Sequence, residues 1–149
     1  RKPNIITSLE LDPAEMEKRN IHLQQKYDEI EANEVRYEEI NCEDAEYLIV
    51  AFGSCARIAQ KTMELARAEG IKVGLLRPIT LWPFPSKAIA ERAKQVKGIL
   101  TVELNAGQMV EDVRLAVECK VPVEHFGRLG GIVPDPDEVV NALKTKLIK

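Results

Sequence analysis

The spacing of apolar residues changes at about residue 35 of the chain. In the first part, four apolar residues recur at spacings of seven, four and three among charged neighbours: Met16, Leu23, Tyr27 and Ile30. This spacing is typical of one face of a helix. Asp12 followed by Pro13 is a typical helix start, so the pattern predicts a helix over residues 13–33. We interpret residues 1–34 as an arm or linker whose helix packs on one side only.

From residue 47 onward, short apolar runs alternate with amphipathic segments. A continuous apolar run is typical of a parallel strand that is covered on both faces. The runs predict four such strands, at residues 47–52, 71–76, 99–104 and 121–126. Apolar residues at helical spacing predict helices that begin near Ser54, Ser86, Gly107 and Asp135. Residues 35–40 mix apolar and charged side chains, which predicts an exposed edge strand.

The order of these segments predicts the fold class. Ser54 is expected to cap the first helix that follows a strand, and Gly70 to close it. Alternating strands and helices imply right-handed crossovers and a three-layer α/β/α sandwich. Residues 35–149 are therefore expected to form one α/β domain that follows the arm.

The composition is ordinary for a globular protein, with 45% hydrophobic and 30% charged residues among 149. A net charge of −3 and a pI near 5.5 give no electrostatic footprint for nucleic acid. No apolar run approaches membrane-spanning length and no signal peptide is recognisable, so we expect no membrane association. The sequence begins with Arg1 rather than Met, which is consistent with a chain cut from a longer protein or with processing.

Three widely spaced cysteines, Cys42, Cys55 and Cys119, favour reduced thiols and a cytoplasmic location. No two of them form a C-x-x-C pair, so we expect no iron–sulfur cluster or zinc held by this chain alone. Cys55 lies beside a predicted helix start, which would lower its thiol pKa, but we interpret it as a small residue of the cap region. His125 alternates with valines along a strand and is interpreted as a packed or edge imidazole.

Residues 75–85 carry three of the eight prolines and the only tryptophan. Because proline lacks a backbone donor and fixes its own φ, the chain should leave the strand at Arg77 as a stiff, non-helical connector. Trp82 and Phe84 are predicted to anchor this connector, with Trp82 substantially buried. The alternative is that Trp82 is exposed because its partner surface belongs to another domain.

Three stretches together resemble one family: residues 47–54 with 56–59, 74–85, and 103–114. They resemble the 2-oxoacid:ferredoxin oxidoreductases, in the C-terminal domain of the subunit related to the α chain. Within that family they are most similar to enzymes that act on branched-chain 2-oxoacids such as 2-ketoisovalerate, or on 2-oxoglutarate. The resemblance implies the fold of the transketolase C-terminal domain, a five-stranded mixed sheet of order 1-3-2-4-5. Residues 35–40 would be its first strand, antiparallel at an edge.

The resemblance also implies what the whole enzyme contains. Such complexes decarboxylate a 2-oxoacid oxidatively with thiamin diphosphate and magnesium, pass electrons through iron–sulfur clusters to ferredoxin, and transfer the acyl group to coenzyme A. The cofactor sites lie in other domains or subunits of an oligomeric enzyme. This chain is therefore expected to be a structural and assembly domain, inactive by itself, with no catalytic or cofactor-binding residues of its own.

In this sheet order, the strand order reverses between the ends of the strands at residues 47–52 and 99–104. The candidate contacts at this switch point and the neighbouring strand end are Ser54, Arg57, Arg77, Glu103, Asn105 and Gln108. They could bind a phosphate or carboxylate, or contact another domain. The simpler interpretation is two capped helices with solvated polar ends, which we favour because every helix start exposes backbone donors.

Two alternatives from other classes stay open. One is a free-standing module that binds a nucleotide or another small phosphate ligand in the switch-point crevice. The other is the equivalent domain of a different thiamin enzyme, such as a transketolase or an oxoacid dehydrogenase component.

Overall fold

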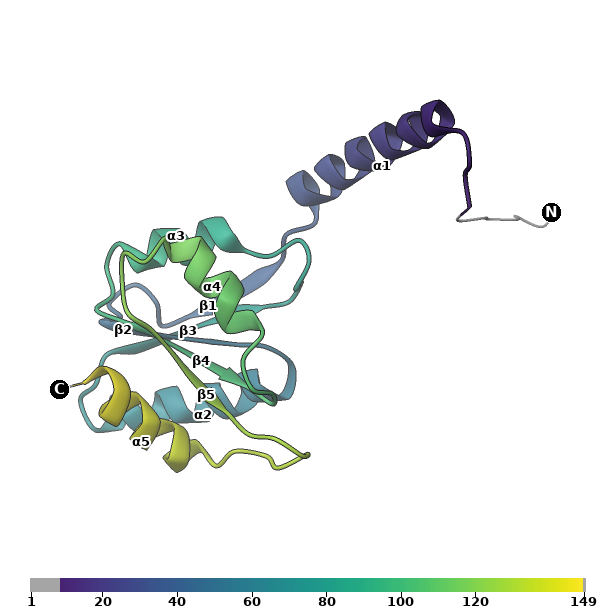
Figure 1. Cartoon of the computed structure of the whole chain (residues 1–149). Helices are drawn as coiled ribbons and strands as arrows, with labels where there is room; N and C mark the ends of the chain where they lie inside the picture. The colour runs from purple at the N-terminus through teal and green to yellow at the C-terminus, as the bar shows by residue number, and fades with distance from the viewer. Residues whose placement is uncertain (1–8, 149) are drawn as a thin grey trace, which may run out of the picture. The chain divides into compact units, whose positions relative to one another are not determined.

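The computed structural model describes residues 9–148, and the chain divides into two compact units between Glu34 and Val35. The first unit holds helix α1 (Pro13–Asn33), and the second, the core unit, holds every strand and the other helices (Figure 1). Among the described residues, no helix is long and apolar enough to cross a membrane.

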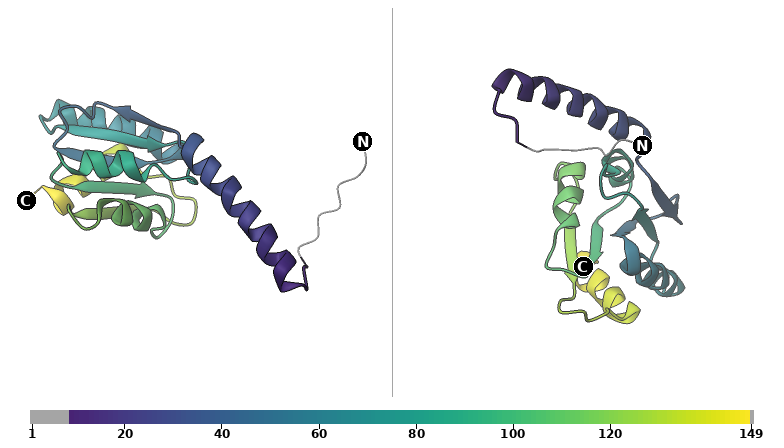
Figure 2. Two further views of the ribbon diagram at one scale, coloured as in Figure 1. Left: turned by 90° about the horizontal axis from the view of Figure 1, so that it is seen from above. Right: turned by 90° about the vertical axis from the view of Figure 1, so that its right-hand side faces the viewer.

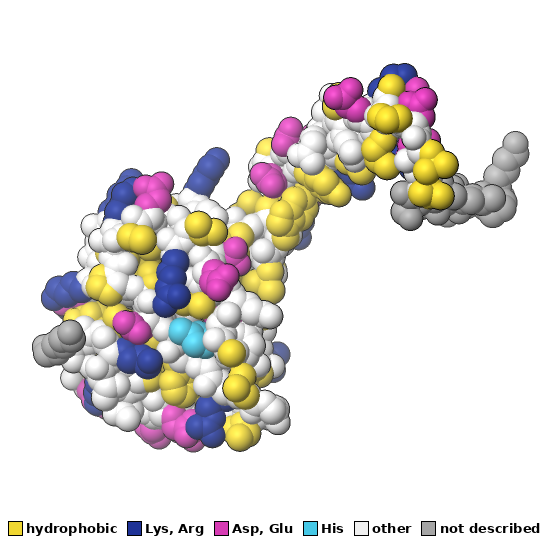
Figure 3. All heavy atoms as spheres, in the orientation of Figure 1, with side chains coloured by type: hydrophobic (Ala, Val, Ile, Leu, Met, Phe, Trp, Pro, Cys, Tyr) yellow, Lys and Arg dark blue, Asp and Glu magenta, His cyan; other side chains and the backbone are white. Residues whose placement is uncertain are grey.

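Helix α1 has the bounds that the sequence predicts. The Asp12 carboxylate accepts the backbone N–H groups of Ala14 and Glu15 at 2.8 and 3.2 Å, which satisfies two donors that have no partner inside the helix. None of the helix residues is buried, and Figure 3 shows hydrophobic side chains along one side of the arm. The apolar stripe of α1 is therefore real, and it is not buried within the described chain.

The core unit is built on one five-stranded sheet. Its strands are β1 (Tyr37–Ile40), β2 (Tyr47–Ala51), β3 (Val73–Pro78), β4 (Ile99–Glu103) and β5 (Val123–Gly127). They are arranged in the order β1-β3-β2-β4-β5, in which β1 pairs antiparallel with β3 and all other pairs are parallel. The predicted sheet order and the antiparallel edge strand are both confirmed.

Helices cover both faces of this sheet (Figures 1 and 2). The four are α2 (Gly53–Ala68), α3 (Ser86–Ala93), α4 (Met109–Val117) and α5 (Pro136–Leu147). Helices α2 and α5 pack together on one face, and α3 and α4 pack together on the other. The three-layer α/β/α sandwich is confirmed.

The central strand β2 shows why its sequence is continuously apolar. Ile49 and Ala51 belong to the core layer beneath α2 and α5, whereas Leu48 and Val50 belong to the layer beneath α3 and α4. All four are fully buried. Because successive side chains of a strand point to opposite faces, a strand that is covered on both faces must be apolar at every position.

The predicted glycine after α2 and the predicted N-cap of α5 are confirmed, whereas the predicted N-cap of α2 is wrong. Gly70 has a φ of +84° and ends α2 with paired N–H bonds from Gly70 to Arg67 and from Ile71 to Ala66. Asp135 starts α5 with a reciprocal capping box. The prediction that Ser54 caps α2 is wrong, because the helix already begins at Gly53 and Ser54 lies inside its first turn.

The proline-rich connector after β3 is held differently from the sequence prediction. Trp82 is 54% exposed, so the predicted burial of Trp82 is wrong, whereas Phe84 packs partly against the layer of α3 and α4. The connector is fixed by Thr80, whose N–H donates to the carbonyl of Arg36 at 3.1 Å. The Thr80 hydroxyl also accepts the N–H of Arg36 at 3.0 Å and donates to the carbonyl of Pro83 at 2.9 Å. Hydrogen bonds to the start of β1 therefore replace the expected tryptophan anchor.

Candidate functional site

The switch point of the sheet lies where β2 and β4 end side by side. The register pairs Ala51 with Val102, so the chain leaves both strands at the same edge and enters α2 and α4 there. The carboxyl ends of β3 and β5 lie at this edge too, because both strands run parallel to β2 and β4. We refer to it as the carboxyl edge of the sheet.

Glu103, the last residue of β4, is fully buried beneath the start of α4. One carboxylate oxygen accepts the N–H groups of Gln108 and Met109 at 3.2 and 2.9 Å, and the other accepts the N–H of Val110 at 3.0 Å. A buried carboxylate is costly unless it is hydrogen-bonded and balanced by positive charge or dipoles. Here three backbone N–H groups supply the hydrogen bonds, and the positive end of the helix dipole balances the charge. Glu103 therefore caps the start of α4.

His125 of β5 completes a polar cluster with Glu103. The register places His125 opposite Thr101, and its Nδ1 lies 3.2 Å from the Thr101 hydroxyl and 3.4 Å from the Glu103 carboxylate. Its Nε2 lies 3.3 Å from the carbonyl oxygen of Asn105, which can only accept, so a hydrogen bond between them is donated by Nε2. The imidazole therefore joins β4, β5 and the loop before α4. This agrees with the interpretation of His125 as a packed imidazole, and its neighbours are Thr101, Glu103 and the Asn105 carbonyl.

Gly127 marks a close approach of two backbone segments in the same cluster. A Cβ at this position would lie 2.2 Å from the carbonyl oxygen of Asn105 and 2.5 Å from Nε2 of His125. Distances that short do not occur for real Cβ atoms, and the first neighbour is backbone rather than a flexible side chain. Only glycine lets the end of β5 lie against the loop that carries Asn105.

Cys55 connects this cluster to the start of α2. Burial raises the pKa of the Cys55 thiol, and the negative charge of Glu103 raises this pKa further. The sequence expectation of a lowered thiol pKa is therefore wrong, because burial and a nearby carboxylate outweigh the helix dipole. Cys55 is therefore a buried, packed thiol.

The remaining candidate residues differ in how far they reach solvent. Ser54 and Arg57 are exposed in the first turns of α2, and Gln108 is exposed before α4. Asn105 is half-buried, and its side-chain oxygen accepts the N–H of Gly107 at 2.7 Å. Arg77 does not face the switch point, because it lies opposite Glu38 of β1 and donates to that carboxylate at 2.9 Å.

Sequence reasoning missed Thr101, His125 and Gly127 as partners of Glu103. Thr101 and Glu103 alternate along one strand, which indicates a shared face, but their contact with His125 depends on the register of β4 against β5. The sequence does not contain that register. The buried acid at the end of an otherwise apolar strand was the signal available.

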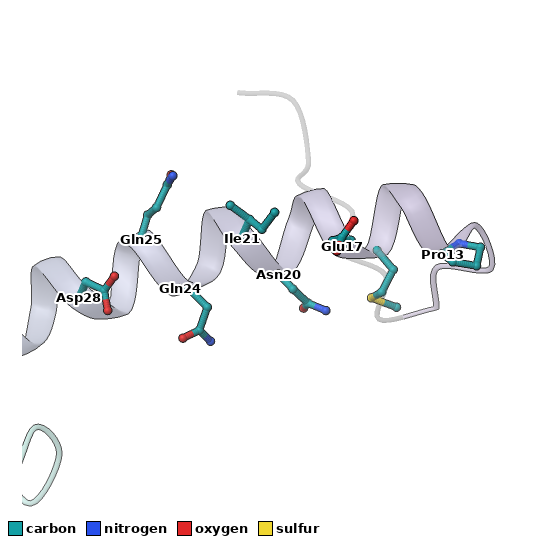
Figure 4. Close-up of a pocket in the computed structure, with 8 residues that line it drawn as sticks. Pro13, Glu17, Asn20, Ile21, Gln24, Gln25 and Asp28 are labelled. Atoms are coloured by element: carbon teal, nitrogen blue, oxygen red, sulfur yellow. The ribbon is translucent and has the colours of Figure 1, made fainter.

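Neither a hollow on α1 nor the metal-ligating side chains of the described residues form a further site. One surface hollow is lined only by residues of α1, and Figure 4 shows these side chains spread along the helix. A single helix cannot enclose a ligand, so this hollow is a flank of the arm. Within residues 9–148, no group of three or more His, Cys, Asp or Glu side chains is placed to hold a metal ion.

Comparison with known proteins decides the family. Residues 45–139 match the model of pyruvate:ferredoxin oxidoreductase core domain II. The chain belongs to this family. The predicted relationship to the 2-oxoacid:ferredoxin oxidoreductases is thereby confirmed. The region that matches core domain II runs from β2 to the start of α5.

Among curated relatives, the ketoisovalerate oxidoreductase subunits VorB are similar over 95% of this chain. The protein of Methanothermobacter marburgensis is 46% identical and that of Methanothermobacter thermautotrophicus is 48% identical, each over 141 residues. The 2-oxoglutarate synthase subunit KorA of Methanothermobacter marburgensis is 33% identical over 68% of the chain. The chain spans 40% of the length of the VorB relatives and 27% of the KorA relative.

Solved structures agree with the fold. The 2-oxoglutarate:ferredoxin oxidoreductase from Magnetococcus marinus matches 93% of this chain with a TM-score of 0.78 at 25% identity, and the match covers 24% of that chain. A split-gene transketolase matches 75% of this chain with a TM-score of 0.64 at 22% identity, over 41% of its own length. The second likeness shows the fold alone, and that fold is the transketolase-like one.

Proposed function

We propose that this chain is a structural and assembly domain of a thiamin-diphosphate-dependent ketoisovalerate:ferredoxin oxidoreductase. The whole enzyme would decarboxylate a branched-chain 2-oxoacid oxidatively to an acyl-CoA and pass the electrons to ferredoxin. The substrate class is supported by the identity of 46% and 48% to VorB subunits, against 29–36% to four KorA subunits.

The buried position of Glu103 is the observation that supports a non-catalytic role. The carboxylate is 0% exposed, and both of its oxygens already accept backbone N–H groups of α4. His125 and Asn105 are hydrogen-bonded within the same cluster. The strongest acid and base candidates at the switch point are thus hydrogen-bonded within the domain, which supports a structural role for them.

The cofactors of such an enzyme would be held elsewhere. We expect thiamin diphosphate, magnesium, iron–sulfur clusters and coenzyme A in other domains or subunits. For the metal groups this is supported by the described residues, which include no group of three or more His, Cys, Asp or Glu side chains placed to hold a metal ion. Of the three cysteines, Cys42 and Cys55 are buried as separate free thiols.

The first experiment separates this domain from a catalytic one. The isolated chain should oxidise neither 2-ketoisovalerate nor 2-oxoglutarate. Calorimetry should detect no binding of thiamin diphosphate with magnesium, and anaerobic reconstitution should leave no iron bound. Tight binding of either group would overturn the assignment. In an assembled enzyme that contains this chain, kcat/KM for 2-ketoisovalerate should exceed that for 2-oxoglutarate.

The partners would be the other domains and subunits of an oligomeric, cytoplasmic complex. Helix α1 is the element that we expect to bridge to them, because none of its residues is buried in the described chain. Deleting residues 1–33 should leave a folded core by circular dichroism and weaken assembly with the partner chains. Unchanged assembly after the deletion would contradict a bridging arm.

A further inference from the structure

The exposed hydrophobic residues of the core unit are gathered at one edge. Ten large hydrophobic side chains of the described core are exposed, and nine of them lie at or beside the carboxyl edge of the sheet. The exception is Leu115, which is 76% exposed on α4. Single exposed hydrophobic residues need no explanation, but a contiguous group at one end of a domain marks an interaction surface.

One part of this surface is the connector after β3. Ile79, Leu81 and Trp82 are 50%, 47% and 54% exposed. They lie beside Val35 and Tyr37, because the N–H of Ile79 donates to the carbonyl of Arg36 at 2.9 Å and Tyr37 pairs with Pro78. The backbone of the connector is thus fixed while its aliphatic and aromatic side chains face outward. Rigid, exposed aromatic side chains are typical anchors of protein interfaces.

The same edge continues across the sheet. Leu104 follows β4 and is 43% exposed. The loop between β5 and α5 adds Leu129, Ile132 and Val133, which are 59%, 52% and 65% exposed. Hydrophobic side chains that follow three of the four parallel strands, β3, β4 and β5, therefore share one end of the core.

We infer that this carboxyl edge docks the part of the oxidoreductase subunit that lies outside the present chain. The inference rests on the proposed function. Two observations point to this occupant. The VorB relatives are far longer, because the chain spans only 40% of their length. The polypeptide also enters the core unit at this edge, since Val35 and Arg36 lie beside the connector after β3.

Such docking would also explain why the sequence predicts a buried Trp82 although the side chain is 54% exposed in this chain. The burial would be supplied between domains. The polar groups at the same edge, Ser54, Arg57 and Gln108, would then form the rim of the interface, since all three are exposed.

The test uses the chain with its single tryptophan replaced by 5-fluorotryptophan, so that one fluorine signal reports on Trp82. The chain is co-expressed with the tagged remainder of the Methanothermobacter marburgensis VorB subunit. We expect retention of the wild-type chain and a shifted fluorine signal. The variant L81S/V133S, altered in two loops of the edge, should be retained at least about tenfold less, whereas L115S should stay within about twofold of wild type.

The outcomes separate the two proposals. If the wild-type chain is retained and the edge variant is retained equally, docking at this edge is wrong while the assembly function stands. If the wild-type chain is not retained, docking of the remainder of the subunit at this edge is wrong. Self-association of the wild-type chain that L81S/V133S abolishes would also overturn the inference, because the occupant would then be a second copy.

Discussion

Helices α2 and α4 begin at the same edge of the sheet, yet their first turns are satisfied in opposite ways. The N–H groups at the start of α4 are accepted by the Glu103 carboxylate, which is fully buried. In the described chain no side chain caps α2, whose opening residues Gly53 and Ser54 are exposed. One helix start is thus closed by an internal charge, and the other is open to the surface.

The difference arises from the strand ends and loop lengths. Strand β2 ends with Ala51, and only Phe52 separates it from α2, so no side chain can reach back over the helix start. Strand β4 ends with Glu103, and residues 104–108 form a loop that sets α4 above the carboxylate. A long enough loop after an acidic strand end therefore lets the strand cap the helix that follows it.

The largest expected effect is the loss of the internal cap. Glu103→Ala leaves three N–H groups without their acceptor, two of them on the buried residues Met109 and Val110. Because hydrogen bonds to a charged group are worth about 1.5–3 kcal/mol each and are not additive, we expect a loss of roughly 3–5 kcal/mol in the free energy of unfolding. Urea denaturation measures it, and Ser54→Ala is the control at the open helix start. Equal losses in the two variants would erase the distinction between α2 and α4.

The next effect concerns the glycine that lets β5 lie against the loop before α4. Gly127→Ala places a methyl group 2.2 Å from the backbone oxygen of Asn105, so the backbone must move. Overpacking of this kind costs about 1–3 kcal/mol, and we expect the upper end of that range. Gly98→Ala is the matched control, because its nearest neighbour at 2.9 Å is the end of the flexible Leu147 side chain. A loss at Gly98 as large as that at Gly127 would contradict the importance of this approach.

A smaller effect links the two helix starts through Cys55. Burial is the main cause of the raised pKa of the Cys55 thiol, and the charge of Glu103 adds to it. Glu103→Gln should therefore lower the pKa of Cys55 without restoring the value of an exposed thiol, which a titration of its 13Cβ chemical shift measures. An unchanged pKa would show that the carboxylate does not act on the thiol.

The same raised pKa has a consequence for alkaline stability. Because the pKa of the thiol is lower in the unfolded chain than in the folded chain, its contribution to the free energy of unfolding is fully present below the unfolded pKa. That contribution is lost as the pH rises from the unfolded pKa through the folded pKa. For Cys42 the interval lies between 9.0 and about 11. The wild-type chain should lose more stability over that interval than Cys42→Ala, since the variant has one thiol fewer to titrate.

The smallest effect on stability is expected at the open helix start. Ser54→Ala and Arg57→Gln change exposed side chains of α2, so each should alter the free energy of unfolding by no more than about 0.5 kcal/mol. Their measurable effect would be on assembly with the other subunits, in the retention experiment described for the carboxyl edge. A large loss of stability in either variant would place these residues in the structural core of the domain.

The sequence predicted the elements of the core because its apolar runs and helical stripes are unambiguous. The sheet order needed the family resemblance, since strand periodicity does not say which strands pair. The sequence does not predict that the Glu103 carboxylate caps α4, because Glu103 stands five positions before Gln108, outside the local capping patterns. The sequence does not predict the exposure of Trp82 either, because large aromatic residues are buried both in cores and in interfaces between domains.

Strand β1 is the shorter of the two edge strands of the sheet. It has four residues, and its only ladder is with β3. Side-chain ion pairs from Glu38 to Arg77 and from Glu39 to Arg92 hold it in addition. A partial opening that released β1 would leave the parallel ladders of β2 to β5 intact. Each such event would uncover the edge of β3, where Leu75 and Leu76 offer an apolar template for strand exchange or aggregation.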